Sequence, residues 1–322
     1  MSKWGLMLAS VVCLFLPACQ QVDSAPRGPF LGLEPTAEPQ LFPDFINTSM
    51  IEFNGTFNPE GTEFYFTTDI PGQGIISFSE MQADGSWTNP AIASFSGTWS
   101  DYDPLLSPDG GRLYFSSRRP VPGLIENRSN IWFVERSGDG WTTPQYVFLN
   151  DHSAYYSSLS SKGDLYFNAW NTGEIHKAVR QDSVNYLVES LGEMLDSLEN
   201  EVDPFIAPDE SYLIFRGYGE KSFGRADLFI SFNLNGRWTP AENLGEPINS
   251  AAQEVCPYVT TDGKLFVFSS DRVSTAYRKD PGTPLNEIRT KAETADNGNQ
   301  NIYYMSADFI EKLRQKYLDG FN

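Results

Sequence analysis

The sequence is poor in cysteine, histidine and positive charge, and it has no long apolar run after its N-terminus. Its three cysteines and two histidines are scattered over 322 residues, so they form neither a zinc-ligand pattern nor a disulfide framework. Against 23 lysines and arginines stand 42 aspartates and glutamates, a net charge of -19. A surface of that sign repels phosphate backbones, which excludes a nucleic-acid partner. Without an 18-residue apolar run, no downstream segment is expected to span a membrane.

Common catalytic and cofactor motifs are absent as well. The chain contains no G-x-S-x-G, no G-x-x-x-x-G-K and no calcium loop of the D-x-D-x-D-G type. Its two histidines, His152 and His176, stand in no nucleophilic context, and we interpret Cys256 as a small buried apolar residue. We therefore expect no cofactor and no bound metal.

The first 19 residues have the order of a secretory signal: a charge (Lys3), an apolar stretch over 4–16, then small residues. The ending Leu16-Pro17-Ala18-Cys19 resembles the bacterial lipobox, in which the cysteine is acylated and becomes the first residue of the mature chain. That resemblance implies a lipoprotein signal peptide over 1–18 and lipidation of Cys19. The alternative is an ordinary cleaved signal with a chance cysteine.

The residues after Cys19 bear on location. Gln20 and Gln21 stand where an aspartate would retain such a lipoprotein at the inner membrane. The resemblance therefore implies an outer-membrane anchor, with the protein on the periplasmic side or at the cell surface. Residues 19–40 are polar and rich in proline, which predicts a flexible tether.

Internal repetition dominates the rest of the chain. Five copies of one segment begin at Ile51 (IEFNGTFNPEGTEFYFTTD), Ser100 (SDYDPLLSPDGGRLYFSSR), Ser153 (SAYYSSLSSKGDLYFNAW), Asn200 (NEVDPFIAPDESYLIFRG) and Gln253 (QEVCPYVTTDGKLFVFSSD). Their turn positions are 49, 53, 47 and 53 residues apart. The third copy departs most from the pattern, because it lacks both the turn proline and a later G-W-T-x-P sequence.

Each copy predicts four short strands. A first strand leads to a Pro-Asp-Gly-like turn, and an aromatic-rich second strand such as Leu113-Tyr114-Phe115 follows. A third strand and an Asp-Gly or Asn-Gly hairpin then lead to a fourth strand that opens with tryptophan. We interpret these tryptophans, Trp87, Trp141 and Trp238, as packing residues. Four strands in each of five units predict an all-β, five-bladed β-propeller over residues 41–307.

The two ends of the chain bear on how the ring closes. The last unit has no fourth strand and runs into a short helical pattern over 308–322, with apolar residues at 309, 310 and 313. The N-terminal LFPDFINTS is similar to LGEPINS of the fourth unit, and Asn47 and Asn249 each lie five residues before an acid. We therefore expect the N-terminal segment to supply the missing outer strand, which would leave no open sheet edge.

These motifs resemble the TolB-type, WD-like propeller repeats of bacterial envelope proteins. The matching pieces are E-x-D-P or E-x-C-P, S-P-D-G, L-Y-F-S-S-R, N-I-W, G-W-T-x-P and L-G-E-P-I-N-S, which together cover residues 41–306. The resemblance implies the fold. It says little about activity, because such propellers serve as scaffolds, as partner binders and occasionally as enzymes.

Candidate functional residues gather at one end of the predicted propeller. The start of a first strand and the end of a second strand lie at the same end of a hairpin, and the long loops open there. The residues that we expect on this long-loop face are Glu52, Asp101, Asp103, Arg118, Arg119, Glu201, Asp203, Arg216, Glu254 and Arg272. Either the repeating acids pair with an arginine or backbone N–H group of a neighbouring blade and fix blade docking, or the cluster is a polar pocket for a glycan, peptide or cation.

Two functions remain open at this point. The first is a non-catalytic, monomeric scaffold that binds a protein or a cell-wall glycan through its long-loop face. The alternative is a glycoside hydrolase-like enzyme, because some five-bladed propellers cleave furanosides with carboxylates that lie about 5–9 Å apart. The polar insert at 273–301 contains a helix start at Thr283-Pro284-Leu285 and is either a flap over the long-loop face or a surface loop without a role.

Overall fold

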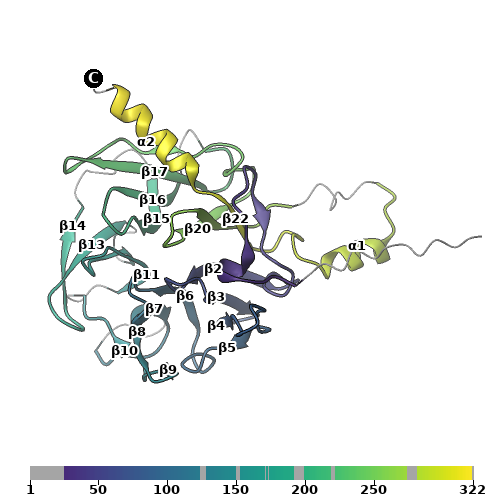
Figure 1. Cartoon of the computed structure of the whole chain (residues 1–322), viewed down its shortest axis with the longest axis horizontal. Coiled ribbons are helices and arrows are strands. Elements are labelled where there is room, and N and C mark those ends of the chain that lie inside the picture. Colours follow the sequence, from purple (N-terminus) through teal and green to yellow (C-terminus); the bar gives the residue numbers. More distant parts are fainter. Residues whose placement is uncertain are drawn as a thin grey trace, which may run out of the picture.

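Five antiparallel sheets form the body of the protein. The computed structural model describes residues 25–123, 128–149, 153–170, 172, 174–191, 199–218, 222–273 and 281–320. The sheets surround a central axis as the blades of a propeller, with the first strand of each blade innermost (Figure 1). The predicted five-bladed all-β propeller is therefore confirmed. The predicted signal peptide over 1–18, the predicted lipidation site Cys19, and His152 lie outside the described residues.

Each blade is a sheet of four main antiparallel strands, ordered from the axis outward. The innermost strands are β2 (Ile51–Phe57), β6 (Asp101–Leu106), β11 (Ala154–Leu159), β15 (Glu199–Ile206) and β20 (Glu254–Val259). The second strands are β3 (Glu63–Ile70), β7 (Arg112–Ser117), β12 (Leu165–Ala169), β16 (Tyr212–Tyr218) and β21 (Leu265–Ser270). The third strands are β4 (Gln73–Glu80), β8 (Asn130–Ser137), β13 (Ile175–Arg180), β17 (Asp227–Leu234) and β22 (Asn301–Ser306). The outer strands are β5 (Ala91–Ile92), β10 (Gln145–Tyr146), β14 (Tyr186–Ser190), β19 (Glu242–Asn243) and β1 (Gln40–Leu41), and two short strands, β9 (Gly140–Trp141) and β18 (Arg237–Trp238), continue hairpins.

The repeat tryptophans pack between elements, as their recurrence indicated. The Trp141 ring lies edge-on to Tyr65 of the preceding blade, with ring centroids 6.0 Å apart, and its indole N–H donates to the Tyr65 hydroxyl at 3.1 Å. Trp87 packs against the core and donates to the Gly28 carbonyl at 2.9 Å. The tryptophan at this position therefore fills the space beside a blade and is not a surface platform for a ligand.

The N-terminal strand closes the ring. Gln40 and Leu41 of β1 pair with Tyr304 and Tyr303 of β22, so the last blade is completed by the first strand of the described chain. Buried Asn47 then clamps the same strand, because its side chain donates to the Ile302 carbonyl at 2.8 Å and accepts from the Ile302 N–H at 2.9 Å. Asn249 makes the same pair of bonds to Leu228 of the fourth blade. The similarity between the two segments thus reflects one structural task.

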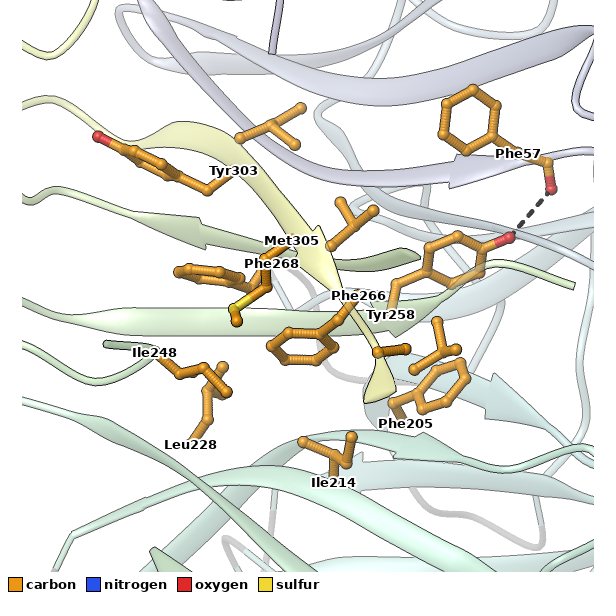
Figure 2. Packing of buried hydrophobic residues seen from close by; sticks show 14 of the residues in the cluster. Phe57, Phe205, Ile214, Leu228, Ile248, Tyr258, Phe266, Phe268, Tyr303 and Met305 are labelled. Atoms are coloured by element: carbon orange, nitrogen blue, oxygen red, sulfur yellow. Dashed lines mark hydrogen bonds between the residues drawn. The ribbon is translucent and has the colours of Figure 1, made fainter. Parts of the chain in front are cut away.

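A large aromatic and aliphatic core spans this junction. Figure 2 shows Phe205, Tyr258, Phe266 and Phe57, from the fourth, fifth and first blades, packed into one cluster. The Tyr258 hydroxyl donates to the Phe57 carbonyl at 3.4 Å, which satisfies a polar group inside an otherwise apolar region. Burial of such side chains contributes about 1.5–3 kcal/mol each and holds neighbouring blades together.

Helix α2 (Asp308–Gly320) confirms the helical pattern at the C-terminal end. Phe309 meets Phe266 with ring centroids 5.1 Å apart, and Tyr317 meets Phe232 at 5.7 Å. The apolar stripe of the helix therefore bridges the fifth and fourth blades (Figure 1).

The structure differs from the expected tether over residues 25–40. A 3-10 helix, η1 (Pro29–Gly32), places Phe30 5.3 Å from Phe57 and buries Leu31 to 1% exposure. The proline-rich composition suggested a free linker, but its few apolar side chains are enough to attach this segment to the first blade. Residues 19–24 lie outside the described residues.

The insert after the fifth blade's second strand contains the expected helix, α1 (Leu285–Ala292). None of its residues is buried, and it lies beside the ring and away from the centre (Figure 1). Asn297 and Asn299 attach the end of the insert to the Ser49 carbonyl at 3.2 and 2.9 Å. A flap over the long-loop face is therefore not the conformation seen here.

The closure makes a stability prediction. Replacing Asn47 with alanine would leave the buried Ile302 N–H without a partner, so Asn47→Ala should lower the free energy of unfolding by about 1–3 kcal/mol. Urea denaturation measures this change, with the exposed α1 residue Asn286→Ala as the control. Equal stability of the two variants would show that this clamp does not hold the ring closed.

Candidate functional site

The repeating acids anchor the segment that enters each blade. Glu52 accepts hydrogen bonds from the backbone N–H and hydroxyl of Thr48 at 2.9 and 2.6 Å. Glu254 accepts the same two bonds from Ser250 at 3.0 and 2.7 Å. Both carboxylates are almost completely buried. Because the arrangement recurs with the blade, it serves blade connection and not a reaction at one place.

Two arginines complete this anchor. Arg119 lies 3.0 Å from the Asp101 carboxylate, and Arg272 lies 3.1 Å from that of Glu254. Each guanidinium also donates to backbone carbonyl groups of the incoming segment. These carbonyls belong to Phe95 for Arg119, and to Pro247 and Ile248 for Arg272.

The expected pairing between neighbouring blades is therefore wrong in one respect. Asp101 and Arg119 belong to the same blade, as do Glu254 and Arg272, because the second strand of a hairpin ends beside the start of the first. Arg118 takes no part in the pairing: its exposed side chain lies 5.9 Å from the ring centre of Tyr102. Buried Glu201 occupies the equivalent acid position, but the segment that enters its blade (192–198) lies outside the described residues.

A second set of equivalent residues lines the central axis two positions after the repeating acid, or after Ala154, which replaces the acid in the third copy. Each lies at an irregularity of an innermost strand and has a positive φ between 49 and 57°. The five residues are Asn54, Asp103, Tyr156, Asp203 and Cys256. We call them the axial ring. Such a backbone conformation costs energy for side chains other than glycine, and its recurrence in all five blades makes it a property of the fold.

The backbone of the axial ring is fixed by side chains of the preceding blade. The N–H groups of Asn54, Asp103, Tyr156 and Asp203 donate at 2.8–3.0 Å to side-chain oxygens on second strands. Those acceptors are Ser269, Thr67, Ser116 and Asn168. The ring backbone is therefore uniform, and only its side chains distinguish one position from another.

The fourth blade breaks this uniformity. Arg216 stands one residue after Phe215, where the other blades carry the short polar acceptors. Its guanidinium lies 3.2 Å from the carboxylate of Asp203, within the axial ring. Arg216 is thus unrelated in position to Arg119 and Arg272, and it places a cation at one point of the ring.

Asp103 is the other distinctive residue of the axial ring. Its carboxylate accepts hydrogen bonds from Asn54 at 3.2 Å and from Ser116 at 3.0 Å. Burial, together with the nearby negative charge of Asp203, raises the pKa of Asp103 to about 6. Burial also raises the pKa of Asp203, although Arg216 opposes that shift. The ring therefore brings two buried carboxyl groups into electrostatic contact, one with an ion-pair partner and one without.

Cys256, also in the axial ring, is buried as predicted, with 4% of its surface exposed. Burial raises the pKa of its thiol well above the usual value, and the charges of Asp203 and Asp103 act in the same direction. A thiol kept protonated in this way is a poor nucleophile.

The axis is closed immediately below the axial ring. Pro104, Pro204, Pro257 and Tyr258 help to line a cavity of about 10 Å³, which is about the space of one water molecule. A sugar or peptide therefore cannot enter the centre of the propeller. Any ligand of this face must bind above the axial ring, among the long loops.

Exposed apolar side chains lie around the axial ring on this face, and the repeat pattern did not predict them. Trp99 is 42% exposed, Trp170 43% and Phe223 56%. The Trp170 ring also packs on Tyr155, with centroids 4.3 Å apart. Their positions could have indicated them, because each stands just before an innermost strand or after a second strand. The position two residues after the repeating acid would likewise have indicated Asn54, and alignment of the third copy, where Ala154 replaces the acid, would have indicated Tyr156.

Metal and histidine chemistry find no support in the part of the chain that the structure describes. Among those residues, no group of three His, Cys, Asp or Glu side chains is placed to hold a metal ion. The His176 ring is buried, stacks on Phe167 at 5.8 Å and hydrogen-bonds Thr172 at 2.9 Å. No helix within the described ranges is long and apolar enough to cross a bilayer.

Comparisons with known proteins support the fold. No protein-family model matches the chain, and no curated protein matches its sequence. An α-L-arabinofuranosidase from Lactobacillus brevis superimposes with a TM-score of 0.52 over 83% of this chain and 92% of that one, at 12% identity. TolB from Acinetobacter baumannii matches at 12% identity and a TM-score of 0.43, over 79% of this chain but only 54% of its own length. At 12% identity, the likeness to the arabinofuranosidase shows the fold alone.

The raised pKa of Asp103 predicts a pH-dependent stability. The folded protein holds this proton more tightly than the unfolded chain does, so the contribution of Asp103 is fully present below about pH 4 and is lost as the pH rises through about 6. Relative to Asp103→Asn, the wild type should therefore lose up to about 3 kcal/mol between pH 4 and 7.5. Asparagine suits this test because it tolerates the φ of 57° at this position.

Urea denaturation at a series of pH values measures this difference, and Asp139→Asn in an exposed hairpin turn is the control. If the wild type and Asp103→Asn show the same pH dependence, Asp103 does not titrate in this range.

Proposed function

We propose that this chain is a non-catalytic envelope protein that binds a protein or cell-wall partner through its long-loop face. The observation that carries the proposal is the uneven distribution of exposed large hydrophobic side chains. Among the described residues, seven of the eleven lie at the long-loop end or in its insert: Met50, Ile70, Trp99, Trp170, Phe223, Val273 and Leu285. The others are Ile92, Phe148, Leu187 and Leu318.

Apolar side chains that gather on one face of a soluble protein mark an interaction site more often than scattered ones do. Tryptophan and phenylalanine contribute strongly to binding when a partner removes them from water. The closed axis supports the same interpretation, because it leaves a broad rim and not a deep pocket for a ligand. The repeating acid–arginine pairs are then parts of the scaffold and do not contact the partner.

The envelope location of this function rests on the sequence. A signal over 1–18 and acylation at Cys19 would hold the propeller at the outer membrane, on the periplasmic side or at the cell surface. Two or three acyl chains bind a bilayer strongly, since each buried CH₂ group contributes about 0.8 kcal/mol. A membrane-held propeller needs only one free face to meet its partner.

A glycoside hydrolase-like activity is the second candidate, and Asp103 is the observation that favours it. A carboxyl group with a pKa of about 6 can donate a proton near neutral pH, and Asp203 is a second carboxylate close by. The L. brevis arabinofuranosidase shares the fold. Against this candidate, both carboxyl groups are more than 90% buried and Asp203 is ion-paired with Arg216.

The binding proposal predicts which surface residues matter. The double variant Trp99→Ala/Phe223→Ala should lose a captured partner by at least about tenfold in affinity, because two exposed rings leave the contact. Pull-down of residues 20–322 from envelope extract identifies the partner, and titration of that partner measures the loss. The matched control is Ile92→Ala/Leu187→Ala, which removes comparably exposed apolar side chains from outer strands.

If both double variants bind the partner with equal affinity, the partner does not bind at the long-loop face. If the captured material is instead an oligosaccharide that the wild type cleaves and Asp103→Asn does not, the hydrolase is correct and the scaffold is wrong.

The variant Cys19→Ser tests the proposed lipid anchor. Without an acylated thiol, the protein should move from the membrane fraction to the soluble fraction on cell fractionation, and incorporation of labelled palmitate should disappear. The matched control is Cys256→Ser, since that cysteine is buried in the propeller. Unchanged membrane association of Cys19→Ser would rule out lipidation at this residue as the anchor.

A further inference from the structure

A groove of about 340 Å³ opens between the second and third blades, beside their short turns and therefore at the end opposite the long loops. Among its lining residues are Asp109, Arg112, Tyr114, Glu135 and Arg180. Its volume is within the range of small-molecule sites. It shares no residue with the axial ring or with the exposed apolar residues of the long-loop face.

At the junction where the groove lies, a tyrosine replaces the packing tryptophan. In the second blade, Trp141 stands opposite Arg136 and its indole reaches the Tyr65 hydroxyl. In the third blade the same register places Tyr186 opposite Arg180, and its hydroxyl lies 3.1 Å from that of Tyr114. Tyr186 thus makes the same contact with a smaller ring, and its partner Tyr114 lines the groove.

The charges at this junction also depart from the repeat. Between the first and second blades, Arg136 forms an ion pair with Glu63. At the next junction, Arg112 occupies the position of Glu63, three residues before the repeat phenylalanine, and Arg180 occupies that of Arg136. An arginine therefore replaces the carboxylate that would have paired with Arg180.

Arg112 and Arg180 differ in the hydrogen-bond acceptors that their guanidinium groups contact. Arg112 donates to one oxygen of Glu135 at 3.0 and 2.7 Å and to the Ser183 carbonyl at 2.8 Å. Arg180 is exposed, and its Nε donates to the Asp182 carbonyl at 3.0 Å. Among the described residues, no carboxylate lies within ion-pair distance of Arg180.

The position of Arg180 is favoured by a glycine. Gly163 has a φ of +82°, and a Cβ atom added there would lie 3.2 Å from Cδ and Nη1 of Arg180. Without that atom, the arginine side chain lies across the turn at the edge of the groove. Among the described residues, Arg180 donates a side-chain hydrogen bond only through Nε, and none accepts from its two terminal nitrogens. A guanidinium can bind a carboxylate in bidentate form through two N–H groups.

From this arrangement we propose that the groove binds a small acidic sugar, with the sugar carboxylate on Arg180 and its hydroxyl groups on the carboxylates of Asp109 and Glu135. Lys162 also lines the groove, but it forms an ion pair with Glu210. The two acidic side chains in the wall disfavour a doubly charged phosphate or sulfate group. They are acceptors, and a ring of hydroxyl donors satisfies them. A ligand with one carboxylate and several hydroxyl groups therefore matches both kinds of lining residue.

Glucuronate is the probe, and calorimetric titration of the purified full-length chain is the measurement. We expect saturable binding that weakens at least about tenfold in Arg180→Gln and in Tyr186→Trp, which restores the ring found in the other blades. Arg136→Gln, at the equivalent site already filled by Trp141, is the control and should bind like the wild type. Glucose has the hydroxyl groups without the carboxylate, and acetate has the carboxylate without the hydroxyl groups. Both should bind more weakly than glucuronate.

The proposal is overturned if glucuronate shows no saturable binding, or if neither Arg180→Gln nor Tyr186→Trp weakens it. Equal loss in Arg136→Gln would overturn it too, because that loss would place the site elsewhere. Arg180 is exposed, so Arg180→Gln remains informative even if Tyr186→Trp does not fold. Loss of the partner at the long-loop face is measured separately and leaves this outcome unchanged.

Discussion

The structure depends on side-chain hydrogen bonds to the backbone N–H groups that are buried where blades meet. Each innermost strand bends at the axial ring, and the bend exposes an N–H group that the ladder no longer pairs. A serine, threonine or asparagine of the preceding blade accepts that N–H, for example Ser269 from Asn54 and Thr67 from Asp103. Asn47 does the equivalent at the closing strand. Because a buried N–H group without a partner is costly, these bonds set the blade order and the closure together.

The repeats also explain which polar residues are informative about function. Glu52, Asp101 and Glu254 have similar surroundings, so their buried charges are explained by blade connection. Arg216 has no counterpart in the other blades. Asp103 shares its residue type only with Asp203, and unlike Asp203 it forms no ion pair among the described residues. The groove between the second and third blades also lies beside a departure from the repeat. In a propeller, a departure from the repeat is therefore a better guide to a ligand than a buried charge is.

The two ends of the propeller offer different chemistry. At the long-loop end, exposed rings such as Trp99 and Phe223 surround an axis that is closed below the axial ring. At the other end, a polar groove lies between two blades, and its Arg180 forms no ion pair among the described residues. Broad apolar surface suits a large partner, and a small charged groove suits a small one. The two proposed sites share no residue, because they lie at opposite ends of the blades.

The sequence by itself determined the number of blades, the strand layers and the closing strand. These follow from local turn chemistry and from the repeat spacing, which are visible in the sequence alone. An example is the equivalent position of Asn47 and Asn249, each five residues before an acid. It did not determine that Arg119 and Arg272 act within their own blades, that residues 25–40 pack on the ring, or that Arg216 reaches Asp203. The groove beside Tyr186 was equally invisible, although the missing tryptophan was plain in the third copy. Such features are decided by which side chains from distant copies meet in space, and only the closed ring brings them together.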